Sequence, residues 1–161
     1  HLEGVVREAA EKFVESRVRE GENLKKDLLA KLSAMSDIVA YIEEKSPQII
    51  EDYKARLIEK VDELAINTQI DDQRIAAEVT MYADKVCVDE EVVRLRSHID
   101  STIKILTEGG AVGRKLDFIV QEMNREANTI LSKANSLIIS DKGIDLKTEI
   151  EKVREQIQNI E

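Results

Sequence analysis

The amino-acid sequence predicts an all-α fold, a long antiparallel helical hairpin followed by a helical bundle, with about six helices in total. Aromatic residues make up only 3% of the 161 residues and Trp is absent, whereas β-sheet cores depend on aromatic and β-branched side chains. A single Pro and six Gly leave few positions for tight turns, so the helices should be long. Apolar residues also recur at intervals of three and four residues, which is the spacing of an amphipathic helix.

Residues 1–68 are predicted to form a long helical hairpin arm. Its first helix starts with an apolar face that includes Val5, Val6, Ala9, Ala10, Phe13 and Val14. Beyond Gly21 the apolar residues follow a pattern close to a heptad repeat: Leu24, Leu28, Leu32, Met35, Val39 and Ile42. Ser46-Pro47 should end this helix, because Pro is favoured at the first position of a helix and disfavoured inside one. A second helix would then return from Pro47 to about Leu64.

Residues 69–161 are predicted to form a C-terminal helical domain. A polar break at 66–72 separates it from the arm, and Gly109, Gly110 and Gly113 mark a loop in its middle. The apolar spacing predicts helices over about 72–84, 90–108 and 113–134. A polar turn is expected around Ser140 to Gly143, and Asp145 is expected to open the last helix.

The net charge of −9 narrows the classes of function. Broad, non-specific binding of nucleic acid normally uses a basic surface, so the charge argues against it. An acidic chain can still carry a local basic patch. An acidic site also attracts divalent cations, so a metal-dependent phosphodiesterase fits this charge better than a passive RNA binder does.

The single cysteine, Cys87, excludes an internal disulfide and fits a reducing cytoplasm. Its neighbours Val86 and Val88 favour a buried or half-buried small hydrophobic residue over a nucleophile. No apolar run approaches the ~20 residues needed to span a bilayer, so no membrane partner is expected.

The first candidate polar face lies in the predicted helix 90–108. Glu91, Arg94 and His98 stand at i, i+3 and i+7, so they share one side of the helix. His98 is the only internal histidine and the side chain best suited to exchange protons near neutral pH. This face could hold a divalent metal or position a general acid or base. A surface histidine beside a local ion pair is the equally acceptable alternative.

The second candidate face lies between Gly113 and Lys133, where amides, hydroxyls and charges are unusually dense. Glu122 and Glu126 are four residues apart, and the rows around them contain Gln121, Arg125, Asn128, Thr129, Ser132 and Lys133. Asn and Thr are poor helix formers, so their concentration here needs a reason. Binding of a metal and phosphate would use these residue types. A structural network at a helix or subunit interface would use the same types, and the spacing does not separate the two.

Four segments in this order resemble the C-terminal domain of the YicC/YloC family of bacterial endoribonucleases. They are RIAAEVTMYADK (Arg74–Lys85), DEEVVRLRSHI (Asp89–Ile99), GRKLDFIVQEMNREANTILSKA (Gly113–Ala134) and KTEIEKVREQIQNIE (Lys147–Glu161). One departure is Leu131, where the resemblance leads us to expect Gly. The resemblance implies a cytoplasmic, metal-assisted RNA phosphodiesterase that assembles as a ring-like homo-oligomer, possibly a hexamer. It also implies an N-terminal domain that this chain does not contain.

The leading hypothesis is therefore the C-terminal domain of a metal-dependent endoribonuclease, with RNA and further copies of the chain as partners. The predicted ligands of a Mn or Mg ion are Glu91, Glu122 and Glu126. His98 is the predicted proton shuttle and completes the catalytic set. The predicted RNA-binding residues are Arg94, Arg114, Gln121, Arg125, Asn128, Thr129, Ser132 and Lys133. Two alternatives stay open: a non-catalytic oligomerisation or interaction module, and an RNA-binding regulator that does not cleave.

Overall fold

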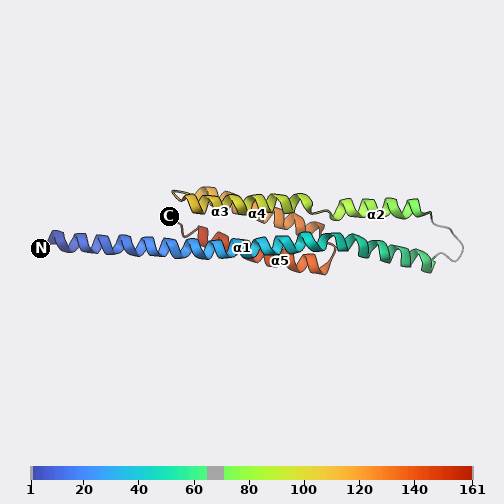
Figure 1. The fold of residues 1–161 in the computed structure, drawn as a ribbon, viewed down its shortest axis with the longest axis horizontal. Coiled ribbons are helices and arrows are strands. Elements are labelled where there is room, and N and C mark those ends of the chain that lie inside the picture. The colour runs from blue at the N-terminus through green and yellow to red at the C-terminus, as the bar shows by residue number, and fades with distance from the viewer. Residues whose placement is uncertain (1, 65–70, 161) are drawn as a thin grey trace.

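The computed structural model describes residues 2–64 and 71–160, and in these ranges the chain forms five α-helices and no strand. The helices are α1 (Leu2–Leu64), α2 (Asp72–Val86), α3 (Asp89–Glu108), α4 (Gly113–Lys133) and α5 (Leu137–Ile157). Figure 1 shows them as an elongated bundle in which α1 runs along the whole length. The all-α prediction is confirmed, with five helices instead of about six.

The predicted hairpin turn at Ser46-Pro47 is wrong, because α1 continues through Pro47 as one helix of 63 residues. A Pro inside a helix costs about 3 kcal/mol. Packing on both sides offsets that cost here. Ile42 before the Pro is fully buried, and Ile49 after it packs against the same core. The tertiary contacts of a continuous helix therefore override the local signal of the Pro.

A hairpin does form, but between α1 and α2. The C-terminal half of α1 lies antiparallel to α2, as Figure 1 shows. Tyr53 of α1 and Tyr82 of α2 stack with ring centroids 3.7 Å apart and an interplanar angle of 10°. The connection between these helices, and with it the predicted domain boundary at 68/69, lies outside the described residues. The division into two domains stays a prediction.

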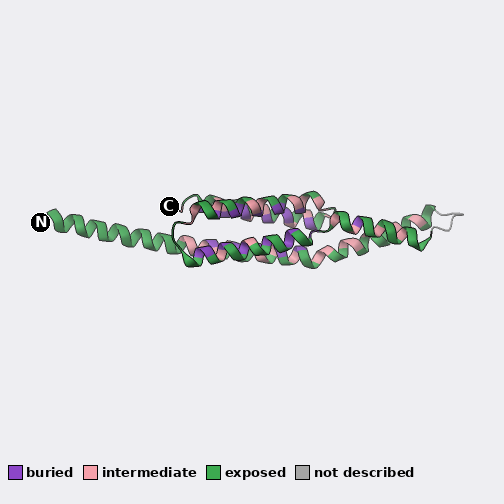
Figure 2. Cartoon of the chain, turned by 90° about the horizontal axis from the view of Figure 1, so that it is seen from above, coloured by how far each residue is buried: buried purple, intermediate pink, exposed green. Residues whose placement is uncertain are grey.

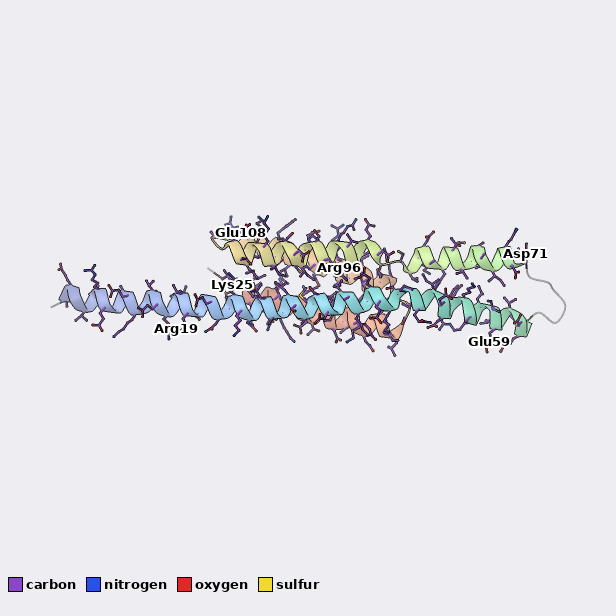
Figure 3. All side chains as sticks on the ribbon, viewed as in Figure 1. Arg19, Lys25, Glu59, Asp71, Arg96 and Glu108 are labelled. Carbon is purple, nitrogen blue, oxygen red and sulfur yellow. The ribbon has the colours of Figure 1, made fainter. Side chains whose placement is uncertain are left out.

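The bundle itself consists of the middle of α1 with α3, α4 and α5. Contacts run from α1 to α3, from α3 to α4, from α4 to α5 and back to α1, so the four segments surround one core. The predicted heptad residues of α1 supply one side of it, and Leu28, Leu32, Met35, Val39 and Ile42 have no exposed surface. Arg96 of α3 points towards α1 and forms an ion pair with Glu43 there (Figure 3).

Residues 2–23 of α1 extend beyond the bundle and are exposed throughout. We call this segment the N-terminal extension; it is the green helix at the end marked N in Figure 2. Its exposed apolar residues include Val5, Val6, Phe13 and Val14 of the predicted face, and also Leu2 and Val18. No described residue of the same chain covers this face.

The predicted polar turn at Ser140 to Gly143 is also wrong, because α5 begins at Leu137 and passes through it. Ile139 and Gly143 are buried in the bundle. Leu131 of α4 lies directly over Gly143: an added Cβ there would be 2.6 Å from Leu131 Cδ2 and 2.9 Å from its Cγ. The Gly therefore makes room for Leu131, which stands where the resemblance leads us to expect Gly.

We predict that Gly143→Ala destabilises the bundle by about 1 kcal/mol. Replacing Gly by Ala inside a helix normally stabilises it by ~1 kcal/mol, but overpacking a core costs ~1–3 kcal/mol, and the contact with Leu131 decides the sign. In the background of Leu131→Ala, the same substitution should instead be stabilising. Urea unfolding of the four proteins measures both effects, and equal stabilisation in the two backgrounds would contradict the contact.

Candidate functional site

The candidate site lies in the seam between α3 and α4, which run antiparallel. Gly109 and Gly110 connect the two helices with φ values of +73° and +98°. This left-handed backbone is accessible to Gly at little cost, so it permits a short reversal. The reversal places the start of α3 beside the end of α4. As a result, the two polar faces predicted from sequence meet each other.

Three predicted site residues converge in this seam. His98 of α3 and Glu122 and Glu126 of α4 each offer one ligand atom, and these atoms all lie within 4.8 Å of one another. We call them the carboxylate–histidine cluster. His98 and Glu122 are half-buried, whereas Glu126 is 5% exposed. Imidazole and carboxylate groups are common ligands of divalent metals, so this donor set fits a divalent cation, and the imidazole favours Mn²⁺ over Mg²⁺, which prefers oxygen ligands.

Guanidinium groups balance the charge of the two carboxylates. Arg94 Nη1 lies 3.7 Å from Glu126 Oε1, and Arg125 Nη1 lies 3.9 Å from Glu122 Oε2. Both distances exceed the 2.7–3.2 Å of a normal N–H···O hydrogen bond. The arginines therefore lower the cost of the buried charge without occupying the oxygens as hydrogen-bond donors. Arg94 is also paired with Glu90 on the surface of α3.

Glu91 is held apart from this cluster by Lys133. Lys133 Nζ donates to Glu91 Oε1 at 2.7 Å and to the Cys87 carbonyl oxygen at 3.1 Å. Glu91 is 3% exposed, and its Oε2 has no hydrogen-bond partner among the described residues. This contact ties the α2–α3 connection to the end of α4. The predicted role of Glu91 as a metal ligand stays a prediction, and His98 takes the third position in the cluster.

The remaining predicted RNA-binding residues lie on the outer surface of α4. Arg114, Gln121, Arg125, Asn128 and Ser132 are exposed, and Thr129 is half-buried. Several of their donors are used locally. The Gln121 amide donates to Asp117 at 3.0 Å, the Thr129 hydroxyl to the Arg125 carbonyl at 3.1 Å, and the Ser132 hydroxyl to the Thr129 carbonyl at 2.9 Å. Among these predicted RNA-binding residues, Arg114 and Arg125 thus supply the exposed positive charges.

Two further observations depart from the sequence analysis. Cys87 is exposed instead of half-buried, because it is the C-terminal cap residue of α2, and the neighbouring Val88 fills the core. Phe118, which lies outside the predicted site, is 64% exposed one turn before Glu122. The sequence analysis did not single out Phe118, which stands among the apolar residues Leu116 and Ile119 in the sequence.

We predict that Lys133→Met lowers the free energy of unfolding by about 2–3 kcal/mol, because it leaves the buried Glu91 carboxylate without its cation. A matched control is Lys12→Met on the N-terminal extension, which removes a salt bridge whose side chains are 73% and 66% exposed. Exposed pairs contribute at most ~1 kcal/mol. Chemical denaturation measures both changes. Similar losses of unfolding free energy in the two variants would show that the Glu91–Lys133 pair contributes no more to stability than an exposed pair.

The fold and the cluster define a class of protein: an all-helical bundle with a carboxylate–histidine group suited to a divalent cation. Comparison with known proteins identifies the family of the chain. The sequence of residues 42–161 matches the family described as endoribonuclease YicC-like, C-terminal. The chain therefore belongs to the YicC-like endoribonuclease family, as the resemblance predicted.

Two curated relatives illustrate the similarity. The chain is 40% identical over 161 residues to a probable endoribonuclease YicC of Clostridioides difficile, covering 99% of this chain and 55% of that protein. It is 38% identical over 149 residues to a probable endoribonuclease YicC of Haemophilus influenzae, covering 92% of this chain and 51% of that protein. The chain thus spans about half the length of these relatives. None of its described helices is long and apolar enough to cross a membrane.

Proposed function

We propose that this chain carries the cation-binding part of a metal-dependent endoribonuclease. The observation that supports the proposal most directly is the convergence of His98, Glu122 and Glu126 within 4.8 Å. Its relatives are named probable endoribonucleases, and the cluster lies within the matched residues 42–161. The cluster would hold Mn²⁺ or Mg²⁺. Such an ion, when bound, neutralises phosphate charge and makes a bound water more acidic.

His98 is better placed as a ligand than as the freely protonating group predicted from sequence. A protonated imidazole has no lone pair for a metal, so binding requires the neutral form of His98. One of its ring nitrogens lies within 4.8 Å of a carboxylate oxygen of Glu122 and of Glu126, and Glu126 is buried. We therefore assign His98, Glu122 and Glu126 together to the metal and assign no general base among the three.

Arg94 and Arg125 are the residues best placed to contact the RNA phosphate. Each guanidinium lies within 4 Å of one cluster carboxylate. A divalent ion held by those carboxylates would weaken their attraction for the arginines. The side chains are 51% and 76% exposed, so both can turn towards a phosphate at the seam. A guanidinium binds two phosphate oxygens at once, which also orients the scissile group.

We predict that the chain cleaves an end-labelled oligoribonucleotide in Mn²⁺ or Mg²⁺, and that Glu122→Gln and His98→Ala each lower the rate at least ~100-fold by removing a metal ligand. The control is Glu155→Gln, an exposed carboxylate on α5 that should have no effect. Mn²⁺ affinity, measured separately by calorimetry, should fall in the two cluster variants only. Metal binding and RNA binding without cleavage would identify a regulator instead. Full activity in both variants would exclude this site.

A specific observation also favours self-association, the second candidate function. Val14 on the exposed apolar face of the N-terminal extension stands two heptads before the fully buried Leu28, so this face partly continues the buried face of α1. At its base lies a groove of about 730 Å³ whose apolar lining includes Leu24, Leu28, Leu106 and Ile160. We infer that this face binds the same face of a second copy. Two extensions paired antiparallel about Phe13 and Val14 would place Arg7 opposite the partner copy's glutamate at position 20.

This pairing would also bring each Leu2 near the groove of the other copy. Both copies would contribute the same face, related by a two-fold axis, as in most homodimers. We predict that Phe13→Glu reduces the molar mass measured by light scattering to that of a monomer. Glu15→Gln, an exposed substitution on the same helix, is the control. A mass that does not change would exclude this face as the contact, and unchanged Mn²⁺ affinity would show that the cluster does not depend on it.

A further inference from the structure

Phe118 is the exposed aromatic residue nearest in sequence to the carboxylate–histidine cluster. The apolar residues around it on α4 face the core, with Leu116 and Val120 fully buried and Ile119 9% exposed. Phe118 points the other way and keeps 64% of its surface exposed. A single exposed apolar side chain is common on protein surfaces. Its significance here comes from the residues that surround it.

Along the surface of α4, Phe118 lies between a cation on one side and a cluster ligand followed by a second cation on the other. Arg114 precedes Phe118 by four residues, Glu122 follows it by four, and Arg125 follows by seven. Residues four apart on a helix have Cβ atoms about 5–6 Å apart, so the ring is adjacent to the cluster. The strip from Arg114 to Arg125 is about 17 Å long at 1.5 Å per residue. Both arginines are exposed.

This composition distinguishes a nucleic-acid strand from a protein partner. Sites for single-stranded nucleic acid combine cations that follow the backbone with aromatic rings on which bases stack. The centre of a protein–protein contact is instead depleted of charge and contains several apolar residues together. Around Phe118 there is one ring, flanked by Arg114, Lys115 and Arg125, all exposed. The strip therefore matches the first description.

We propose that Phe118 stacks on an unpaired RNA base next to the phosphate held at the carboxylate–histidine cluster. The inference rests on the proposed function, because it assumes that the cluster acts on RNA. Both faces of a base inside a duplex are covered by its neighbours, so such a base cannot stack on a side chain unless it leaves the helix. Phe118 thereby makes the site select single strands, loops or bulges over continuous duplex.

Binding in Mn²⁺ to a cleavage-resistant oligoribonucleotide, with 2′-O-methyl groups and phosphorothioate linkages, tests this inference separately from cleavage. Fluorescence anisotropy with a labelled single-stranded oligoribonucleotide should give a Kd that rises about 5- to 150-fold in Phe118→Ala, the effect of losing one base–aromatic stack. Phe118→Trp should restore binding, whereas Phe118→Leu, which keeps an apolar side chain, should not. Affinity for the same sequence as a blunt duplex should change less than twofold. Val93→Ala, at a residue that is 65% exposed on α3, is the control.

A second readout reports the stack directly. An oligoribonucleotide with 2-aminopurine at successive positions should show Phe118-dependent quenching at one position. Unchanged single-strand affinity in Phe118→Ala, or full recovery in Phe118→Leu, would overturn the inference. So would a fall in molar mass in Phe118→Ala, because the ring would then contact another protein. Phe118-dependent binding without cleavage would overturn only the proposed nuclease. Cleavage with unchanged strand preference in Phe118→Ala would overturn only the role of Phe118.

Discussion

The packing of α3 against α4 buries two carboxylates in one seam, and the rest of the site depends on how their charges are balanced. Removing a carboxylate from water costs several kcal/mol unless a cation and hydrogen bonds replace the solvent. Lys133 does both for Glu91, with a hydrogen bond of 2.7 Å. Glu126 has Arg94 at 3.7 Å, which is too long for a hydrogen bond. The seam therefore contains one directly hydrogen-bonded ion pair, Glu91–Lys133, and one carboxylate, Glu126, whose nearest cation lies beyond hydrogen-bond distance.

These two carboxylates have different consequences for the geometry. Because Lys133 also binds the Cys87 carbonyl, it fixes the beginning of α3 to the end of α4. The turn at Gly109 and Gly110 fixes the opposite end of the same pair. With both ends held, the register of α3 against α4 is set, and His98 must lie beside Glu122 and Glu126. Glu91 thus helps to set the position of the cluster through its contact with Lys133.

The sequence allowed the helices and their buried faces to be predicted where periodicity was long and regular. The heptad from Leu28 to Ile42 became the core of α1 as expected. Predictions from single residues did less well. Pro47 and the polar stretch before Asp145 were interpreted as helix boundaries, but long-range packing holds both inside helices. Spacing also identified the polar face of each site helix. It could not give their register, which decides that His98, and not Glu91, joins the two glutamates.

The carboxylate–histidine cluster and the N-terminal extension lie in separate parts of the structure. All three cluster residues come from α3 and α4, and the bundle that holds them is complete within the described chain. The extension precedes the matched residues 42–161, and its apolar face has no cover from the described residues of this chain. A helix with such a face is stabilised by packing more than by its own propensity. Burial of this face against a partner would therefore stabilise the extension, whereas the geometry of the cluster follows from contacts inside the bundle.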